Sequence, residues 1–183
     1  MDMTGERLIA APRAKVWAAL NDPQMLKECI PGCDSIEKTS ETQMKATASI
    51  RLGPVSAKFS GKLNLSDLDP PSGYKISGEG QGGAAGFAKG GAEVRLAEQP
   101  GGTLLSYSVQ AQVGGKLAQV GGRLIDATAK SMADQFFKRF AAQLEPPPED
   151  RASETTGEAR SPADSDANWL IRLWRALIGF LSR

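Results

Sequence analysis

GGKLAQVGGRLIDATAKSMADQFFKRFAAQL, residues 114–144, is the segment that decides the fold of this chain. Its apolar side chains recur at spacings of three and four, which places them on one face of an α-helix: Leu117, Val120, Leu124, Thr128, Met132, Phe136, Phe140 and Leu144. We therefore predict one helix across 114–144, about thirty residues long against an average of ~11–12. Because strands are predicted before it, its apolar face must be buried against a sheet.

Two adjacent glycines, Gly121 and Gly122, interrupt this pattern. Inside a helix each would cost roughly 1 kcal/mol relative to alanine, so Gly121→Ala is expected to stabilise the helix. The pair has two interpretations: the backbone packs closely on the sheet there, or half of the helix can shift.

The chain before this helix alternates apolar and polar residues with a period of two, which is typical of antiparallel strands with one buried face. The predicted strands are 4–9, 43–52, 55–66, 74–80, 87–97 and 103–113, with two short helices between the first and second, ending at the IPGC of residues 30–33. The sequence therefore predicts an α+β fold, a curved antiparallel sheet around a long C-terminal helix.

The inward positions of the strands 74–80 and 87–97 carry almost no side-chain volume. A close-packed interior needs volume, so either the helix sinks onto the sheet or a cavity remains that a ligand fills. We favour the cavity. Glycine-rich turns at 53–54, 81–86 and 114–115 should gather at one end of such a meander and form its entrance.

The predicted ligand-binding residues come from the inward strand positions and from the first turns of the helix, with Tyr107 as the polar partner. They are Phe59, Leu63, Ile76, Phe87, Ala88, Ala92, Val94, Leu105, Tyr107, Val109, Leu117, Val120, Gly121 and Leu124.

The composition changes abruptly after Leu144. Residues 145–167 are rich in proline, serine and acids, which predicts a disordered linker spanning about 25–30 Å. Residues 168–183, NWLIRLWRALIGFLSR, predict an amphipathic helix suited to a membrane interface, or alternatively to docking on protein. The residues predicted to contact the membrane are Trp169, Arg172, Leu173, Trp174, Arg175 and Phe180. Residues 1–144 would form the ligand-binding domain.

Histidine is absent, which removes histidine-based catalytic triads and histidine metal ligands. Cys29 and Cys33 supply two thiols where a closed zinc site needs four ligands, so we predict no metal site. The first seven residues contain no apolar signal segment, and we expect a cytoplasmic protein, peripheral on the inner membrane. No residues have the spacing of a catalytic pair, and none is predicted to be catalytic.

Several stretches together resemble the carbon monoxide dehydrogenase G-subunit (CoxG) family, within the START/SRPBCC helix-grip superfamily. They are IPGC at 30–33, GPV at 53–55, FSG at 59–61, GFAKG at 86–90, TLLSY at 103–107 and VGGKLAQVG at 113–121, continuing to Phe136 and Phe137. The resemblance covers roughly residues 1–144. It implies an accessory protein of molybdenum hydroxylases such as carbon monoxide dehydrogenase, associated with membrane tethering and with a lipid quinone.

Our leading hypothesis is therefore a non-enzymatic protein that binds a lipid quinone such as menaquinone, has no covalently bound cofactor and no nucleic-acid partner, and links its partner enzyme to the membrane. Two alternatives remain open. One is a cyclase- or hydrolase-like enzyme of the same fold that uses Tyr107 or a helix carboxylate. The other is an assembly or docking factor with a collapsed core and no ligand.

Overall fold

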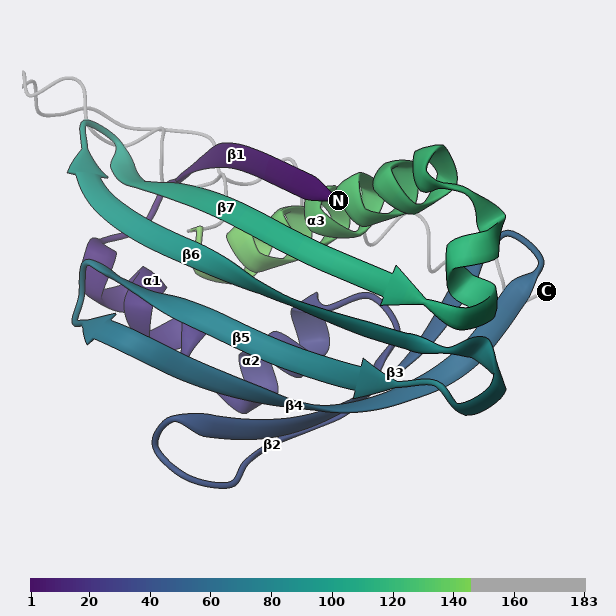
Figure 1. Ribbon diagram of the computed structural model, residues 1–183. Helices are drawn as coiled ribbons and strands as arrows, with labels where there is room; N and C mark the ends of the chain where they lie inside the picture. Colours follow the sequence, from purple (N-terminus) through teal and green to yellow (C-terminus); the bar gives the residue numbers. More distant parts are fainter. Residues whose placement is uncertain (146–183) are drawn as a thin grey trace, which may run out of the picture. The chain divides into compact units, whose positions relative to one another are not determined.

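The computed structural model describes residues 1–145, and these are built on one antiparallel sheet in the order β1-β7-β6-β5-β4-β3-β2 (Figure 1). The strands are β1 (Asp2–Ile9), β2 (Cys33–Lys38), β3 (Gln43–Leu52), β4 (Val55–Asp69), β5 (Gly73–Gln81), β6 (Phe87–Gln99) and β7 (Gly102–Gly114). The helices are α1 (Arg13–Leu20), α2 (Pro23–Cys29) and α3 (Gly122–Leu144), with short 3-10 helices η1 (Gly83–Ala85) and η2 (Gly115–Val120). The predicted α+β helix-grip fold, with a curved sheet around the C-terminal helix, is confirmed.

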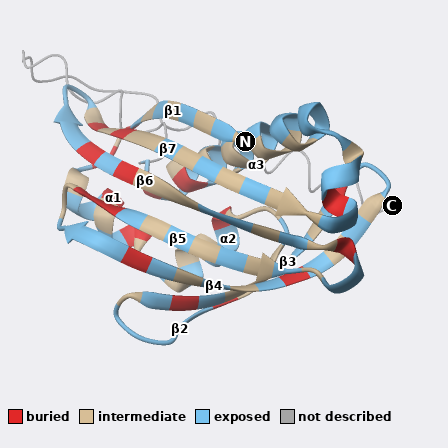
Figure 2. Ribbon diagram, viewed as in Figure 1, coloured by how far each residue is buried: buried red, intermediate tan, exposed pale blue. Residues whose placement is uncertain are grey.

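The two faces of the sheet follow the alternation in the sequence. Inward side chains on the concave face are buried or half-buried, and outward ones are mostly exposed (Figure 2). Along β4, for example, Phe59 and Leu65 are buried while Lys58, Ser60 and Asn64 are exposed. The period-two pattern therefore identified the face that carries the core.

The strand β2 was not predicted, and the second helix was wrongly extended to Cys33. Helix α2 ends at Cys29, and residues 33–38 form an edge strand that pairs only with β3. Ile36 is its one buried residue, and its register shifts between Cys33 and Ser35. Because a register shift of this kind breaks the alternation, this short edge strand has no clear sequence pattern.

The single helix predicted across 114–144 is also wrong. The segment divides at Gly121, which has a φ of 93° and lies between η2 and α3. A side chain rarely adopts that backbone conformation, so Gly121 permits a chain reversal that alanine would resist. Gly121 and Gly122 therefore sit at the start of α3 and not inside it.

The interior of the described residues has two apolar clusters. The large core lies under α1, α2 and the C-terminal half of α3, and it includes Ile9, Val16, Leu105, Phe140 and Leu144. The small core lies at the other end of the sheet and consists of Leu52, Phe59, Ala85 and Leu117, with half-buried neighbours such as Val120.

Candidate functional site

A trough of about 350 Å³ lies on the concave face, between the inward positions of the large core and those of the small core. Its floor comes from β3, β4, β5, β6 and β7, and no residue of α3 lines it. The lining residues are Ala46, Ala48, Phe59, Gly61, Leu63, Ile76, Gly78, Glu79, Gly80, Ala88, Lys89, Gly90, Gly91, Ala92, Val109 and Ala111. A hollow thus lies above the small inward residues, where the missing volume in the sequence predicted a cavity.

Glycine is required at the centre of this floor. A Cβ at Gly61 would collide with the carbonyl oxygen of Glu79 on β5, and one at Gly90 with the carbonyl oxygen of Gln110 on β7. Neighbouring strands could not keep their present approach if either position carried a side chain. The same residues that let the sheet coil here also leave the trough empty.

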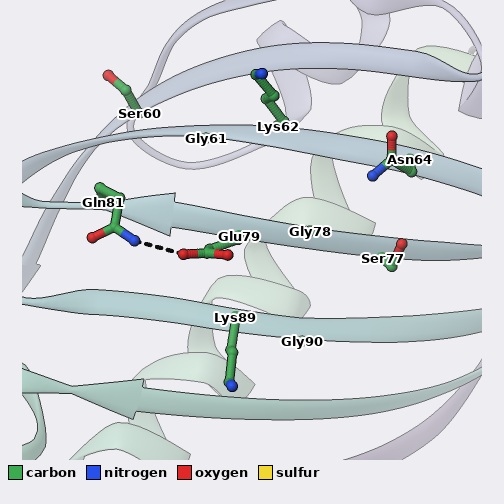
Figure 3. Close-up of a pocket in the computed structure, with 10 residues that line it drawn as sticks. All are labelled: Ser60, Gly61, Lys62, Asn64, Ser77, Gly78, Glu79, Gln81, Lys89 and Gly90. Carbon is green, nitrogen blue, oxygen red and sulfur yellow. Dashed lines mark hydrogen bonds between the residues drawn. The ribbon is translucent and has the colours of Figure 1, made fainter.

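A second hollow of about 660 Å³ lies on the opposite, convex face of the same glycines (Figure 3). It shares Gly61, Gly78, Gly90, Glu79 and Lys89 with the trough, and every lining residue other than the glycines is polar: Ser60, Lys62, Asn64, Ser77, Glu79, Gln81 and Lys89. Gln81 Nε2 donates a hydrogen bond to Glu79 Oε1 at 2.6 Å, across the outer surface. Although larger, this hollow offers no apolar side chain, so the concave trough is the better candidate for an apolar ligand.

Six predicted ligand-binding residues line the trough: Phe59, Leu63, Ile76, Ala88, Ala92 and Val109. Their ligand-binding role stays a prediction. The lining residues not predicted as contacts include Ala46, Ala48 and Ala111 and the glycines of the floor. Their signal was present in the sequence, because small residues at inward strand positions are what leave the space.

The other predicted residues lie elsewhere. Val94 and Leu105 are buried in the large core, and Leu117 with Val120 belongs to the small core. None of these four lines the trough. Val94 and Leu105 lie on the predicted face, but their places along β6 and β7 put them beyond the glycine-rich centre. Leu117 and Val120 lie on η2, which follows the end of β7.

Three other residues predicted to bind the ligand, Phe87, Leu124 and Gly121, lie at exposed positions outside the trough. Phe87 and Leu124 are 37% and 39% exposed, and a Cβ added at Gly121 would have no atom within 4 Å. Phe87 begins β6 in the outward phase, since Ala88 and Ala92 face the trough. Leu124 lies on the poorly covered first turn of α3, beside Gly53.

Tyr107 does not line the trough but joins the sheet to α3. Its ring stacks on Phe137 with the centroids 5.1 Å apart, and the Arg7 guanidinium lies 5.7 Å from the centroid of Phe137. Arg7 also makes an ion pair with Asp134 of α3. This stack holds the β1 side of the helix against the sheet.

The opposite side of α3 is more open. A cleft of about 410 Å³ between α3 and β3 is lined by Thr128 and Met132 together with Ile50 and Arg51. Thr128 and Met132 were expected to face the sheet within the apolar stripe. This cleft shares no lining residue with the trough, to which α3 also contributes none.

The inner surface of the trough presents few groups for acid–base or metal chemistry. Glu79 and Lys89 are the charged residues of the trough lining, and their side chains lie on the convex face (Figure 3). Burial raises the pKa of the Cys29 and Cys33 thiols, which lowers their thiolate fraction near neutral pH. Within residues 1–145 no three His, Cys, Asp or Glu side chains gather as metal ligands would.

The predicted linker 145–167 and the predicted membrane helix 168–183 lie outside the described residues, apart from Glu145. The membrane contacts proposed for Trp169, Arg172, Leu173, Trp174, Arg175 and Phe180 therefore stay predictions. None of the helices in residues 1–145 has the length and apolar character needed to span a bilayer.

A curved antiparallel sheet packed against a long C-terminal helix, with an apolar trough on the concave face of the sheet, defines a helix-grip domain of the SRPBCC class. The chain belongs to the carbon monoxide dehydrogenase G-subunit (CoxG) family, whose model matches residues 5–145. The predicted family is therefore confirmed.

Solved structures agree with this assignment. A conserved protein from Geobacillus kaustophilus is 32% identical, with a TM-score of 0.74 over 79% of this chain and 95% of that chain. A putative uncharacterized protein from Rhizobium leguminosarum is 14% identical, with a TM-score of 0.61 over 79% of this chain and 93% of that one. The di-domain ARO/CYC protein BexL is 15% identical, with a TM-score of 0.59 over 81% of this chain and 51% of its own. The last two show the fold alone. A search of curated protein sequences found no match.

Proposed function

We propose that this protein is a non-enzymatic accessory protein that holds an apolar, lipid-like ligand in the trough and links a molybdenum hydroxylase, such as carbon monoxide dehydrogenase, to the membrane. The observation that carries the proposal is an apolar trough floored by alanine and glycine in a member of the CoxG family. The name of the family supports an accessory role, and the apolar lining of the trough supports an apolar ligand.

The ligand we propose is a lipid quinone such as menaquinone. A volume of about 350 Å³ lies near the lower end of the ~300–1,000 Å³ of small-molecule sites. The trough would therefore hold a ring and part of a prenyl chain, while the remaining chain extends beyond it on the side that no residue of α3 lines. Alanine, leucine, isoleucine and valine side chains supply apolar contact without competing hydrogen-bond groups.

A quinone head group needs a polar partner, and Tyr107 is our candidate. It is the next inward residue after Val109 along β7, and Val109 lines the trough. Tyr107→Phe should weaken quinone binding by about 0.5–1.5 kcal/mol, the usual contribution of one hydrogen bond. If the protein were an enzyme that used this hydroxyl as acid or base, the same change would lower turnover ~10²–10⁴-fold.

The membrane link is assigned to the C-terminal segment, on the cytoplasmic face of the inner membrane. Two tryptophans and three arginines in residues 168–183 suit the interface of an anionic bilayer. Deletion of residues 168–183 should release the protein from phosphatidylglycerol vesicles in a flotation assay. Equal flotation of the full-length and shortened chains would contradict this assignment.

The ligand is tested by native mass spectrometry of the full chain, purified from a quinone-producing host, together with solvent extraction. The expected result is a mass increment that disappears on extraction and is recovered as a prenylated quinone. Protein that carries no apolar compound, and takes up none when mixed with quinone-loaded vesicles, would refute the proposed ligand and favour an assembly factor.

A further inference from the structure

The two ends of the sheet differ in charge. One end, here called the basic end, comprises the segments 51–56, 81–89 and 113–124, which include the β3–β4 turn, η1 and η2. These segments carry Arg51, Lys89, Lys116 and Arg123 and contain no acidic residue. The other end, here called the acidic end, comprises 38–43, 66–73 and 97–103, which carry Lys38 and the acids Glu41, Asp67, Asp69 and Glu98.

The segments of each end lie together because the strands are antiparallel and sequential (Figure 1). At the basic end the backbone of Gly86 closely approaches Gly114 and Gly115, and Gly53 lies next to Leu124. The glycine-rich turns at 53–54, 81–86 and 114–115 thus gather as predicted from the meander.

The two ends also differ in ion pairing. Within residues 1–145, Arg51, Lys89, Lys116 and Arg123 appear in none of the salt bridges. At the acidic end, Asp67 pairs with Lys75 and Glu98 with Arg13. Three acids lie close to these segments: Glu79 opposite Lys89 on β5, Asp126 on α3, and Asp34, which pairs with Lys58 and accepts a hydrogen bond from Ser49. With all three acids and Lys58 counted, positive charge remains in excess there.

The basic end also exposes apolar side chains. Phe87 and Leu124 are 37% and 39% exposed there, and Leu68 at the acidic end is 43% exposed, so the two ends differ in the charge beside these residues and not in apolar exposure alone. Near Leu124 in the sequence, Lys116 lies on η2 and Arg123 on the first turn of α3. Apolar side chains surrounded by unpaired lysine and arginine match a bilayer interface that bears anionic head groups.

We propose that the basic end is a membrane-docking surface of the domain itself, which places η1, η2 and the start of α3 against an anionic bilayer. Its partner is the lipid surface, and its contact is separate from that of residues 168–183. The purpose of docking rests on the proposed function. A carrier that faces the bilayer with this end could exchange a lipid quinone between the bilayer and the trough, past the small core. The contact itself can be measured without any bound ligand.

The first test places an environment-sensitive dye at either end of the full chain. Ala118→Cys labels the basic end and Glu41→Cys the acidic end, and both positions are exposed. The wild-type chain is labelled in parallel to record the signal of Cys29 and Cys33, which are buried and half-buried. With phosphatidylglycerol vesicles the dye at residue 118 should shift to the blue, and the dye at residue 41 should not.

A chain that binds these vesicles with no spectral shift at residue 118, or with equal shifts at both positions, would overturn the proposal. Failure of the chain to bind at all would overturn it too. Neither result depends on whether a quinone occupies the trough, so the failure of this proposal is distinguishable from failure of the proposed ligand.

The second test removes the charge. Each basic residue near an anionic surface contributes about 1 kcal/mol, so Lys116→Gln with Arg123→Gln should weaken vesicle binding up to about 30-fold at low salt. The matched control is Lys38→Gln with Lys45→Gln, which changes the net charge equally at exposed positions away from the basic end. Equal loss in both double variants would indicate net charge alone and would overturn the assigned surface.

Discussion

The large core and the small core lie on the same face of the same sheet, yet they are built differently. The large core is covered by three helices and contains fully buried side chains such as Phe140, Ile9 and Leu105. The small core has four buried members and is covered by short 3-10 helices with half-buried residues around them. Because local stability follows the density of buried apolar contacts, the small core is the end expected to open first.

Helix α3 belongs to both regions and shows the difference along its own length. Its C-terminal half contributes the buried Phe140 and Leu144, and Lys15 Nζ donates a hydrogen bond to the Leu144 carbonyl at 3.0 Å. Its first turns leave Leu124 exposed and no residue touching the trough. Helix α3 is therefore buried in the core at its C-terminal end and poorly covered at its first turns.

The largest effect is expected when the large core loses a side chain. Phe140→Ala should cost about 3–5 kcal/mol of unfolding free energy, because the ring is fully buried and its surroundings cannot collapse. Leu117→Ala in the small core should cost only about 2 kcal/mol, since exposed neighbours can relax into the space. Denaturant unfolding, supported by amide hydrogen exchange, measures the loss of unfolding free energy in each variant. Equal losses in the two variants would contradict the difference between the cores.

The large core also predicts a pH dependence. Burial raises the pKa of Tyr74 to about 12, and its ring makes an edge contact with Trp17. The neutral phenol is favoured in the folded state, so stability is complete below the unfolded pKa near 10 and falls as the pH rises towards 12. The loss should reach roughly 2–3 kcal/mol. Tyr74→Phe should remove this part of the alkaline slope, and an unchanged slope would refute the assignment.

The glycine pair at the start of α3 offers a matched comparison within the weaker region. Gly121→Ala should destabilise by about 1–3 kcal/mol, because the φ of 93° is strained for any side chain. Gly122→Ala should stabilise by about 0.4–1 kcal/mol, because Gly122 is helical and nothing obstructs a Cβ there. The measurement is the melting temperature of each variant. If both melting temperatures shifted in the same direction from the wild type, α3 would not begin where the structure places it.

Much of the fold follows from side-chain periodicity, and the errors have local causes. The inward faces of β3, β4 and β7 were predictable because apolar residues alternate over many positions. The break at Gly121 was not, because a 3-10 helix also repeats about every three residues, so Leu117, Val120 and Leu124 keep a helical spacing across it.

The sequence predicted a hollow on the concave face, but only some of the residues that line it. Small inward residues such as Gly78, Gly90 and Ala92 indicated missing volume, and the trough lies over them. Whether Val94 or Leu105 meets a ligand or fills the core depends on how far each helix extends along the sheet. That position is a tertiary property that strand alternation does not contain.

The central claim is that the trough holds an apolar ligand, and filling it is the most direct test. Ala92 lies between Ile76 and Val109 on the trough floor, while Ser108 is exposed on the convex side of β7. The measurement is ligand occupancy by native mass spectrometry of wild type, Ala92→Leu and the control Ser108→Leu, each with a thermal melt. We predict that Ala92→Leu loses the extractable apolar compound with little change in melting temperature, while Ser108→Leu keeps it. A closed core would instead lose about 1–3 kcal/mol of stability through overpacking, and that loss together with no bound compound in the wild type would contradict the claim.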